Sequence, residues 1–264
     1  MIAFLPSRTV AVELFGFAVH WYGLMYLAAF LLAWWMLPRL QKFRGIALSS
    51  EAWGDILTAA ILGVILGGRL GFVLLYAPQF YLAHPVEILK VWRGGMASHG
   101  GFLGVTLALL WILRGRSREE ILRIADIVVV PVALGLALGR VGNFINGELY
   151  GSVSTLPWAM AFPEAEGLRH PWPLYAVLKD LCIAALCSLS LRWSSVPGKT
   201  TSLFLVLYAI LRFALEWLRD QPYGWVEAGP IALSWGQMYC IPILFIGMGL
   251  WLHVRKNADV GPRT

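Results

Sequence analysis

Long apolar runs alternate with short polar connections along the whole chain. Seven of these runs approach the length of about 20 residues with which an α-helix crosses the hydrocarbon core of a bilayer. Backbone polar groups inside lipid must find their hydrogen bonds within the segment, so the runs are predicted to be helices. They lie near 19–37, 54–76, 96–114, 121–138, 174–191, 201–219 and 236–253.

The composition agrees with this pattern. Hydrophobic residues make up 59% of the chain and charged residues 14%, and the mean hydropathy is +0.69. Soluble domains carry about a quarter charged residues, so this chain is excluded from that class. We therefore expect an all-α integral membrane protein with about seven transmembrane helices, in which residues 1–264 form a single polytopic membrane domain.

Lysine and arginine are distributed unevenly over the connections. Twelve fall in one set of loops and only five in the opposite set. By the positive-inside rule, the N-terminus is predicted outside and the C-terminus in the cytoplasm. The net charge of +6 reflects this asymmetry, and short basic groups beside helices favour anionic lipid head groups over nucleic acid. The larger set is Arg39, Lys42, Arg44, Arg114, Arg116, Arg118, Arg123, Arg192, Lys199, Arg255, Lys256 and Arg263, and the smaller is Arg8, Lys90, Arg93, Arg169 and Arg219.

The longest connection, 139–173, is expected outside and begins with a polar, glycine-rich stretch at Gly139–Gly151. Charges beside a membrane-length segment are costly and usually functional. Here Arg140 supplies a cation, Glu148 a carboxylate, and Asn143 and Asn146 amides, while the glycines permit close approach. The alternative is a tight turn that caps a helix with a buried salt bridge.

Four basic residues fall outside the counted loops: Arg69, Arg140, Lys179 and Arg212. The predicted topology places all four in the outer half of the bilayer. A polar cavity that binds an anion, such as a phospholipid phosphate, explains this shared depth. The glycines around Arg69 also permit a nucleotide-loop interpretation, but close packing between membrane helices explains them better.

One predicted helix carries several of these groups on a single face. Tyr208, Arg212, Glu216 and Arg219 are spaced four, four and three residues apart. The alternative is an Arg212–Glu216 pair that neutralises itself inside the bundle.

His99 lies among the glycines of Gly94–Gly101, at the outer start of a predicted helix. Tyr22 likewise lies at the outer start of the first predicted helix. A histidine is suited to taking a proton near neutral pH, and a thiol nucleophile needs such help. The alternative is an interfacial histidine that is only hydrogen-bonded.

Five segments together, in this order, resemble the prolipoprotein diacylglyceryl transferase family: His20–Tyr26, Gly68–Val73, Gly94–Gly101, Gly139–Gly151 and Leu233–Gln237. The resemblance implies a bacterial cytoplasmic (inner) membrane enzyme with its active site toward the extracytoplasmic side. Its substrates would be phosphatidylglycerol and the lipobox cysteine in a prolipoprotein signal peptide. Its products would be a thioether and glycerol-1-phosphate, formed within the membrane lipids without cofactor or metal.

The resemblance also implies most of the site residues, and the depth and spacing of the polar residues add Arg69, Asn146 and Arg219. The catalytic candidates are His99, Arg140, Arg212, Tyr22 and Glu148. The substrate-binding candidates are Arg69, Asn143, Asn146, Gly151, Tyr208, Glu216 and Arg219.

The chain departs from the family in two places. The family usually reads His-Pro-(Ser/Thr)-Gln-Leu-Tyr-Glu where this chain has His170–Ala176, and Arg-x-Pro-Asp where it has Arg219–Pro222. Lys179 and Asp180, one turn later, are candidates to compensate for the first. Two other functions stay open: a phospholipid-binding or lipid-transport protein, and a divergent paralogue with another thiol or amine acceptor.

Overall fold

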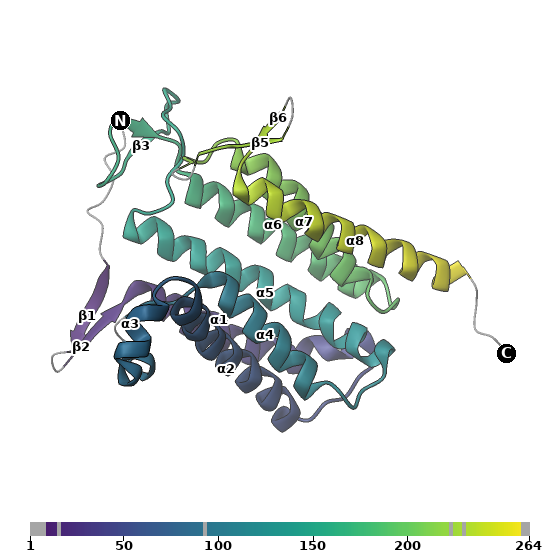
Figure 1. The fold of residues 1–264 in the computed structure, drawn as a ribbon. Helices are drawn as coiled ribbons and strands as arrows, with labels where there is room; N and C mark the ends of the chain where they lie inside the picture. Colours follow the sequence, from purple (N-terminus) through teal and green to yellow (C-terminus); the bar gives the residue numbers. More distant parts are fainter. Residues whose placement is uncertain (1–8, 15–16, 92–93, 222–223, 229–230, 260–264) are drawn as a thin grey trace. The chain divides into compact units, whose positions relative to one another are not determined.

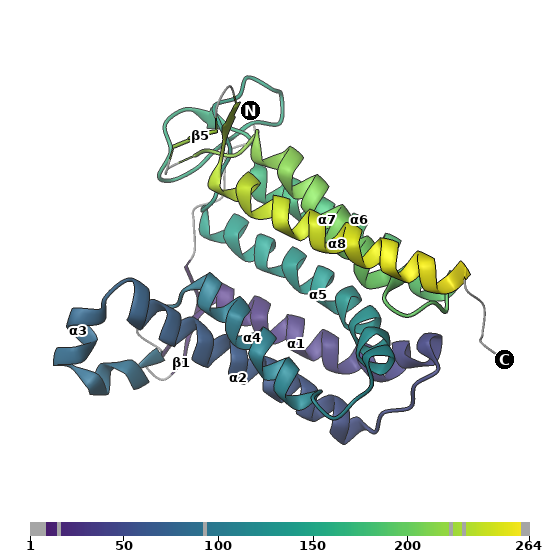
Figure 2. The same ribbon diagram turned by 45° about the vertical axis from the view of Figure 1, so that its right-hand side comes forward.

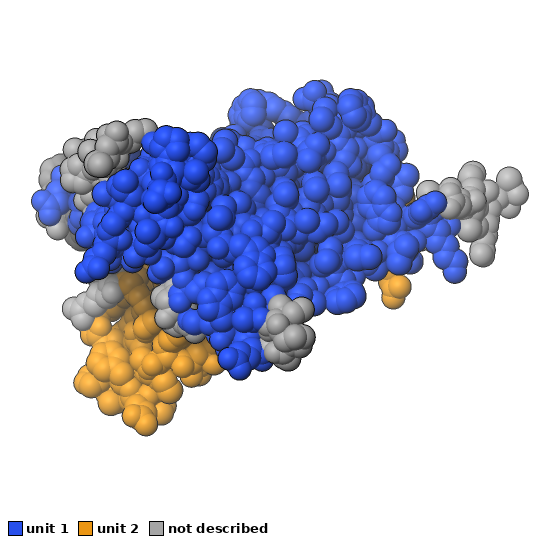
Figure 3. All heavy atoms as spheres, turned by 90° about the horizontal axis from the view of Figure 1, so that it is seen from above, with its two compact units in different colours: residues 1–46, 122–264 blue, residues 47–121 orange. Residues whose placement is uncertain are grey.

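The computed structural model describes residues 9–14, 17–91, 94–221, 224–228 and 231–259. The chain divides into two compact units, coloured separately in Figure 3. Unit 1 comprises Met1–Ile46 and Leu122–Thr264, and unit 2 comprises Ala47–Ile121. A helix lies at each of the seven predicted ranges: α1 (Trp21–Leu40), α2 (Ser50–Leu75), α4 (Ser98–Ile112), α5 (Arg118–Asn146), α6 (Trp172–Trp193), α7 (Lys199–Glu216) and α8 (Trp235–Asp259).

Five of these helices are long and apolar enough to cross a membrane, counted over the described residues. They are α1 with the turn that follows it, α2, α5, α6 and α8. By contrast, α4 has only 15 residues, and α7 carries three charges, Lys199, Arg212 and Glu216, within its 18 residues. The chain is thus a mostly helical, multi-pass membrane protein. The count of seven spans and the orientation remain predictions, and Arg8, Arg93 and Arg263 lie outside the described residues.

Short elements that hydropathy did not predict connect the helices. Between α2 and α4 lie α3 (Pro78–Ala83) and the 3₁₀ helix η2 (Pro85–Leu89), and η1 (Gln41–Arg44) follows α1. Three antiparallel hairpins satisfy backbone groups outside the helices. They are β1 (Val10–Leu14) with β2 (Phe17–His20), β3 (Met160–Ala161) with β4 (Leu168–Arg169), and β5 (Val226–Ala228) with β6 (Ile231–Leu233).

In unit 2, α2 packs closely against α4. Gly63, Gly67 and Gly71 of α2 face Gly100 and Gly104 of α4, where a side chain would collide with the opposite backbone. The interpretation of these glycines as helix-packing residues is confirmed, and it replaces the nucleotide-loop alternative.

In unit 1, α6, α7 and α8 run side by side, as Figure 1 and Figure 2 both show. α7 packs against both α6 and α8. α5 contributes a buried stripe that includes Ile127, Val130 and Ala133, spaced three residues apart on one face. The hairpin β3–β4 precedes α6 and β5–β6 precedes α8, so both lie at the end of the bundle where α5 ends (Figure 1).

α5 continues two turns beyond its predicted end at residue 138 and stops at Asn146. The first eight residues of the predicted 139–173 loop are therefore helical. The sequence pattern missed this because Arg140, Asn143 and Asn146 are polar. They remain helical because their side chains bond within the protein, as in the Arg140 Nη1 to Asn143 Oδ1 hydrogen bond of 3.2 Å.

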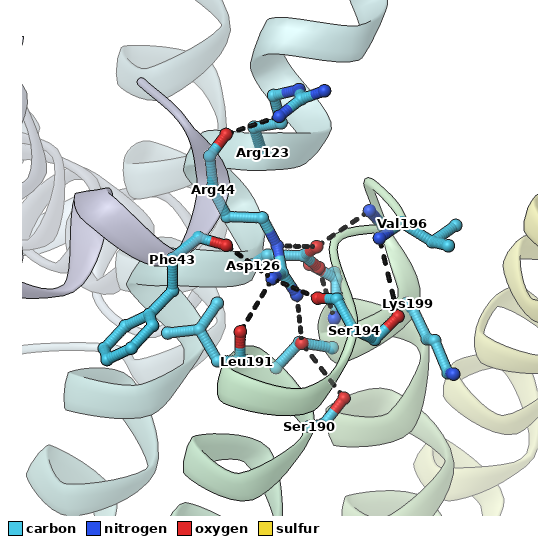
Figure 4. Close-up of polar contacts among 12 residues, drawn as sticks. Phe43, Arg44, Arg123, Asp126, Ser190, Leu191, Ser194, Val196 and Lys199 are labelled. Carbon is cyan, nitrogen blue, oxygen red and sulfur yellow. Dashed lines mark hydrogen bonds and ion pairs between the residues drawn. The ribbon is translucent and has the colours of Figure 1, made fainter. Parts of the chain in front are cut away.

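A buried charged cluster joins the opposite end of α5 to α6 and α7 (Figure 4). Arg44, the last residue of η1, is 1% exposed, and its Nε donates to Asp126 Oδ2 at 2.8 Å. Asp126 also accepts from the backbone nitrogens of Gly198 and Thr201 and from the Thr201 hydroxyl. The remaining Arg44 nitrogens donate to oxygens of Phe43, Leu191, Ser194 and Thr200. Arg44 is thus an exception among the basic groups expected beside lipid head groups, because its guanidinium is enclosed by protein.

Candidate functional site

The stretch Gly139–Gly151, called the signature from here on, leaves α5 through a tight turn. Gly147 has φ of 74° and Leu149 φ of 55°, a left-handed conformation that is uncommon for a residue other than glycine. Glu148 N donates to Asn143 O at 2.9 Å, and Asn146 Nδ2 donates to Glu148 Oε1 at 2.6 Å. The buried Oδ1 of Asn146 has no hydrogen-bond partner among the described residues. Three of the predicted polar side chains are thus gathered at the end of α5.

Gly151 fastens this turn to two distant segments. Its backbone nitrogen donates to His170 O at 2.9 Å, and Ser152 N donates to Leu218 O at 3.0 Å. A Cβ atom on Gly151 would lie 2.6 Å from His170 Cβ and closer still to Leu218 O. Only glycine fits, so Gly151 holds the signature against the start of α6 and the end of α7 through its backbone.

Three arginines from these segments surround one buried indole. Trp172, the first residue of α6, is 0% exposed. The guanidinium carbons of Arg140, Arg212 and Arg219 lie 5.3, 4.9 and 5.4 Å from its ring centroid. The predicted convergence of Arg140 with Arg212 is therefore present within unit 1.

Glu216 is the carboxylate that pairs with two of these arginines. Its Oε2 pairs with Arg212 Nη1, and its Oε1 lies 3.2 Å from Arg219 Nη1. The Arg212–Glu216 pair considered from the sequence is real, but two cations share one carboxylate. Within the described part of the chain, Arg140 has no ion pair: its guanidinium donates to the Asn143 amide oxygen and lies against the Trp172 ring. The cluster thus keeps a positive charge that an anion can neutralise.

Two predicted tyrosines lie beside this cluster. Tyr22, in the first turn of α1, packs at Gly142, one turn below the end of α5. Tyr208 of α7 lies beneath Lys179, whose Nζ is 4.3 Å from the tyrosine ring centroid. Lys179 is itself buried and paired with Asp180, so this cation is neutralised next to the arginines.

Arg69 lies in unit 2 in a different environment. Its guanidinium donates to the carbonyls of Glu87, Ile88, Lys90, Gly94 and Gly95, at 2.5 to 3.4 Å. These bonds occupy its donors and do not fit a direct contact with substrate. They fasten the segment before α4 to α2, as does the 2.8 Å bond from Ala97 N to Gly68 O. The backbone of His99 belongs to the first turn of α4, as predicted, but its side chain lies outside the described residues.

Sequence reasoning missed several residues that hold the site. Trp172 gave no signal, because an aromatic residue beside a membrane helix is normally read as interfacial. Gln221 Nε2 donates to Glu216 O at 3.1 Å and to its Oε1 at 3.3 Å. Ser234 and Gln237 cap α8 reciprocally, and Gly236 leaves room for the Glu216 carboxylate. The Ser-x-x-Gln spacing is a capping signature that the sequence did offer.

Both departures from the family pattern therefore touch the arginine cluster itself. Trp172 belongs to the first departure and Gln221 to the second. Pro222 lies outside the described residues. Within the described part of the chain, no three or more His, Cys, Asp and Glu residues come together as a metal site would require.

Comparison with known proteins adds independent evidence. Residues 9–253 match the family described as prolipoprotein diacylglyceryl transferase. A phosphatidylglycerol–prolipoprotein diacylglyceryl transferase of Methylibium petroleiphilum is 43% identical over 94% of this chain and 97% of its own length. The protein of that name from Nitratidesulfovibrio vulgaris is 42% identical over 99% of both chains. One from Cereibacter sphaeroides is 42% identical over 94% of this chain and 95% of its own.

Proposed function

The chain belongs to the prolipoprotein diacylglyceryl transferase family, and we propose that it transfers the diacylglyceryl group of phosphatidylglycerol to the lipobox cysteine of a prolipoprotein. The observation that carries this proposal is the gathering of Arg140, Arg212 and Arg219 around Trp172. Arginine suits a phosphodiester because its planar fork donates two parallel hydrogen bonds.

The reaction displaces a phosphate ester at carbon. The cysteine thiolate attacks the carbon of the diacylated glycerol that carries the phosphate. A C–S bond forms there, and the bond from that carbon to the phosphate oxygen breaks. The electron pair of that bond leaves with glycerol-1-phosphate, which gains one negative charge. Arg140 and Arg212 stabilise this developing charge, which is where fixed cations contribute most to a rate.

The other candidates take supporting roles. Glu216 and Asn143 orient the arginines, since both bond directly to guanidinium groups. The unpartnered Asn146 Oδ1 accepts a hydrogen bond from a hydroxyl of the glycerol head group, and Glu148 fixes the Asn146 amide. Tyr22 and Tyr208 position the lipid. Arg219 adds positive charge to the phosphate clamp, the name used here for Arg140 and Arg212 together. Gly151 acts through its backbone.

His99 takes the proton of the cysteine thiol in this scheme. Arg69 then has a positioning role, because it holds the carbonyls of Gly94 and Gly95, just before His99 in the chain. In His99→Gln, turnover should fall by roughly 10²–10⁴-fold, as for loss of a general base. Binding of phosphatidylglycerol should persist. Loss of stability and lipid binding together would indicate instead that His99 only braces the turn.

The decisive experiment mixes purified protein, phosphatidylglycerol and a lipobox peptide. Glycerol-1-phosphate and the thioether peptide should appear in equal amounts. Phosphatidylcholine and a peptide with serine in place of cysteine are the matched controls. Lipid binding without a released phosphate ester would favour a transport or binding protein, and thioether formation only on another thiol would favour a paralogue. Expression in bacteria depleted of their own transferase tests the same activity in cells.

The proposed setting is the bacterial inner membrane, with seven spans, an external N-terminus and the site on the extracytoplasmic side. The uneven lysine and arginine distribution supports it. In a chain freed of its three native cysteines, a cysteine placed at Glu166 should react with an impermeant reagent in intact cells. One placed at Arg116 should react only after the cells are opened. The reverse pattern would overturn this orientation.

A further inference from the structure

Trp172 is held rigidly at the centre of the arginine cluster. The indole is fully buried, and its Nε1 donates to Leu215 O of α7 at 2.8 Å. Its backbone nitrogen donates to His170 O at 2.7 Å, beside the point where Gly151 is fastened. The ring thus has a fixed position relative to α7 and to the signature.

The three guanidinium carbons all lie within the distance at which cations are attracted to an aromatic face. They come from different elements: Arg140 from α5, Arg212 from α7, and Arg219 from the segment that follows α7. Like charges that gather in a poorly solvated place repel each other. The negative face of one indole offsets part of that repulsion for all three.

An aromatic ring differs from a carboxylate in what it takes from an arginine. A carboxylate accepts the N–H groups, so an arginine neutralised in this way has fewer donors for a ligand. A ring attracts the cation through its face and accepts none of these hydrogen bonds. We infer that Trp172 is a positioning residue for the transfer reaction: it holds Arg140 beside Arg212 and Arg219, and it leaves N–H groups of Arg140, which has no carboxylate partner in the described part of the chain, for the phosphate of the lipid.

This inference rests on the proposed function, because it names the residue that prepares the same clamp for a phosphodiester. Its test compares Trp172→Phe and Trp172→Leu in the purified full-length protein, with KM for phosphatidylglycerol and kcat measured separately. KM should rise in the order Trp, Phe, Leu, by roughly 10-fold for leucine, as expected when cation–π contacts are lost. Trp53→Leu, which removes an equally buried indole from unit 2, measures the general cost of that loss.

A fluorinated series separates the ring's charge from its shape. Tryptophan with one, two or three ring fluorines, inserted only at position 172, keeps the Nε1–H bond and nearly the same size while weakening the negative face. Affinity for phosphatidylglycerol should fall with each fluorine at unchanged thermal stability. If Trp172→Leu does not fold, this series still shows whether the negative face of the ring contributes to binding of phosphatidylglycerol.

The outcomes are distinct. If the wild-type protein transfers lipid but neither fluorination nor Trp172→Leu changes KM, Trp172 is only a packing residue and the inference is wrong. If the wild-type protein neither binds nor converts phosphatidylglycerol, the proposed function itself fails.

Discussion

Two arginine clusters lie at opposite ends of α5 and are built on different principles. Asp126 and Arg140 are 14 residues apart on this helix, which separates the clusters by roughly 21 Å. At the first, Arg44 is enclosed, paired with Asp126 and bonded through every guanidinium nitrogen (Figure 4). At the second, Arg140 has one amide partner and an aromatic face.

The difference shows how an arginine in an apolar chain can be assigned a role from its partners. Each guanidinium nitrogen of Arg44 is bonded within the protein, and these bonds join η1, α5, α6 and α7, so its role is structural. Arg140 lies in the same kind of apolar chain without a carboxylate partner, a state that is costly unless a ligand supplies the charge. Arg69 belongs with Arg44 in this respect, because its donors are taken by carbonyls.

The largest effect is expected on stability at the first cluster. Arg44→Ala leaves the Asp126 carboxylate buried without its charge partner, and breaking such a pair costs about 3–5 kcal/mol. Denaturant titration in detergent should show that loss. Arg39→Ala is the matched control, since Arg39 is exposed and five residues earlier, and it should change the free energy of unfolding by less than about 0.5 kcal/mol. A stable but inactive Arg44→Ala protein would break the comparison.

The second cluster should show the opposite behaviour. In Arg140→Ala, turnover should fall by about 10²–10³-fold, as when a fixed donor to developing charge is removed. Stability should change little, because Arg140 makes one side-chain hydrogen bond. Arg140→Lys should rescue poorly, since a point charge replaces a planar fork. Arg169→Ala is the control: this arginine pairs with Asp220 and not with the groups around Trp172, so the variant should retain turnover. Near-normal activity of Arg140→Ala would remove the phosphate clamp.

Glu216→Gln should give an intermediate result, because Glu216 is the buried carboxylate of the second cluster. The glutamine keeps the size but weakens the bonds to Arg212 and Arg219, and hydrogen bonds to charged groups contribute about 1.5–3 kcal/mol. Both the free energy of unfolding and kcat should fall. Glu164→Gln, in an exposed loop, should change neither. A loss of stability with unaltered kcat would assign Glu216 to structure alone.

The sequence predicted the helices well because apolar length is a local property. It failed where polar residues remain helical, as at the end of α5, because hydropathy does not register a hydrogen bond such as the one from Arg140 to Asn143 within the helix. It also counted Arg44 with the exposed loop cations and grouped Arg69 with Arg140 in one anion-binding cavity, although their partners differ.

The roles of these arginines depend on groups distant in the sequence: Asp126, the carbonyls of 87–95, and Trp172. A single-sequence pattern holds no information on which of these a guanidinium will meet. For the same reason the family resemblance implied Arg140 and Arg212 as site residues but did not imply Trp172, whose indole lies between them.

The smallest effects are expected at Gln221, and they sharpen the comparison most. Gln221→Ala removes hydrogen bonds to Glu216 and should cost about 0.5–1.5 kcal/mol of stability with little change in KM.

Gln221→Glu has the same size but adds a carboxylate beside the arginines, which makes the second cluster more like the first. The new charge competes with the lipid phosphate, so KM for phosphatidylglycerol should rise about fivefold, for roughly 1 kcal/mol of partly solvated charge interaction. High salt should reduce the difference between the two variants, because exposed charges are screened. If the folded Gln221→Glu protein kept the wild-type KM, the arginines around Trp172 would not be binding the phosphate, and the contrast between the two clusters would be one of packing alone.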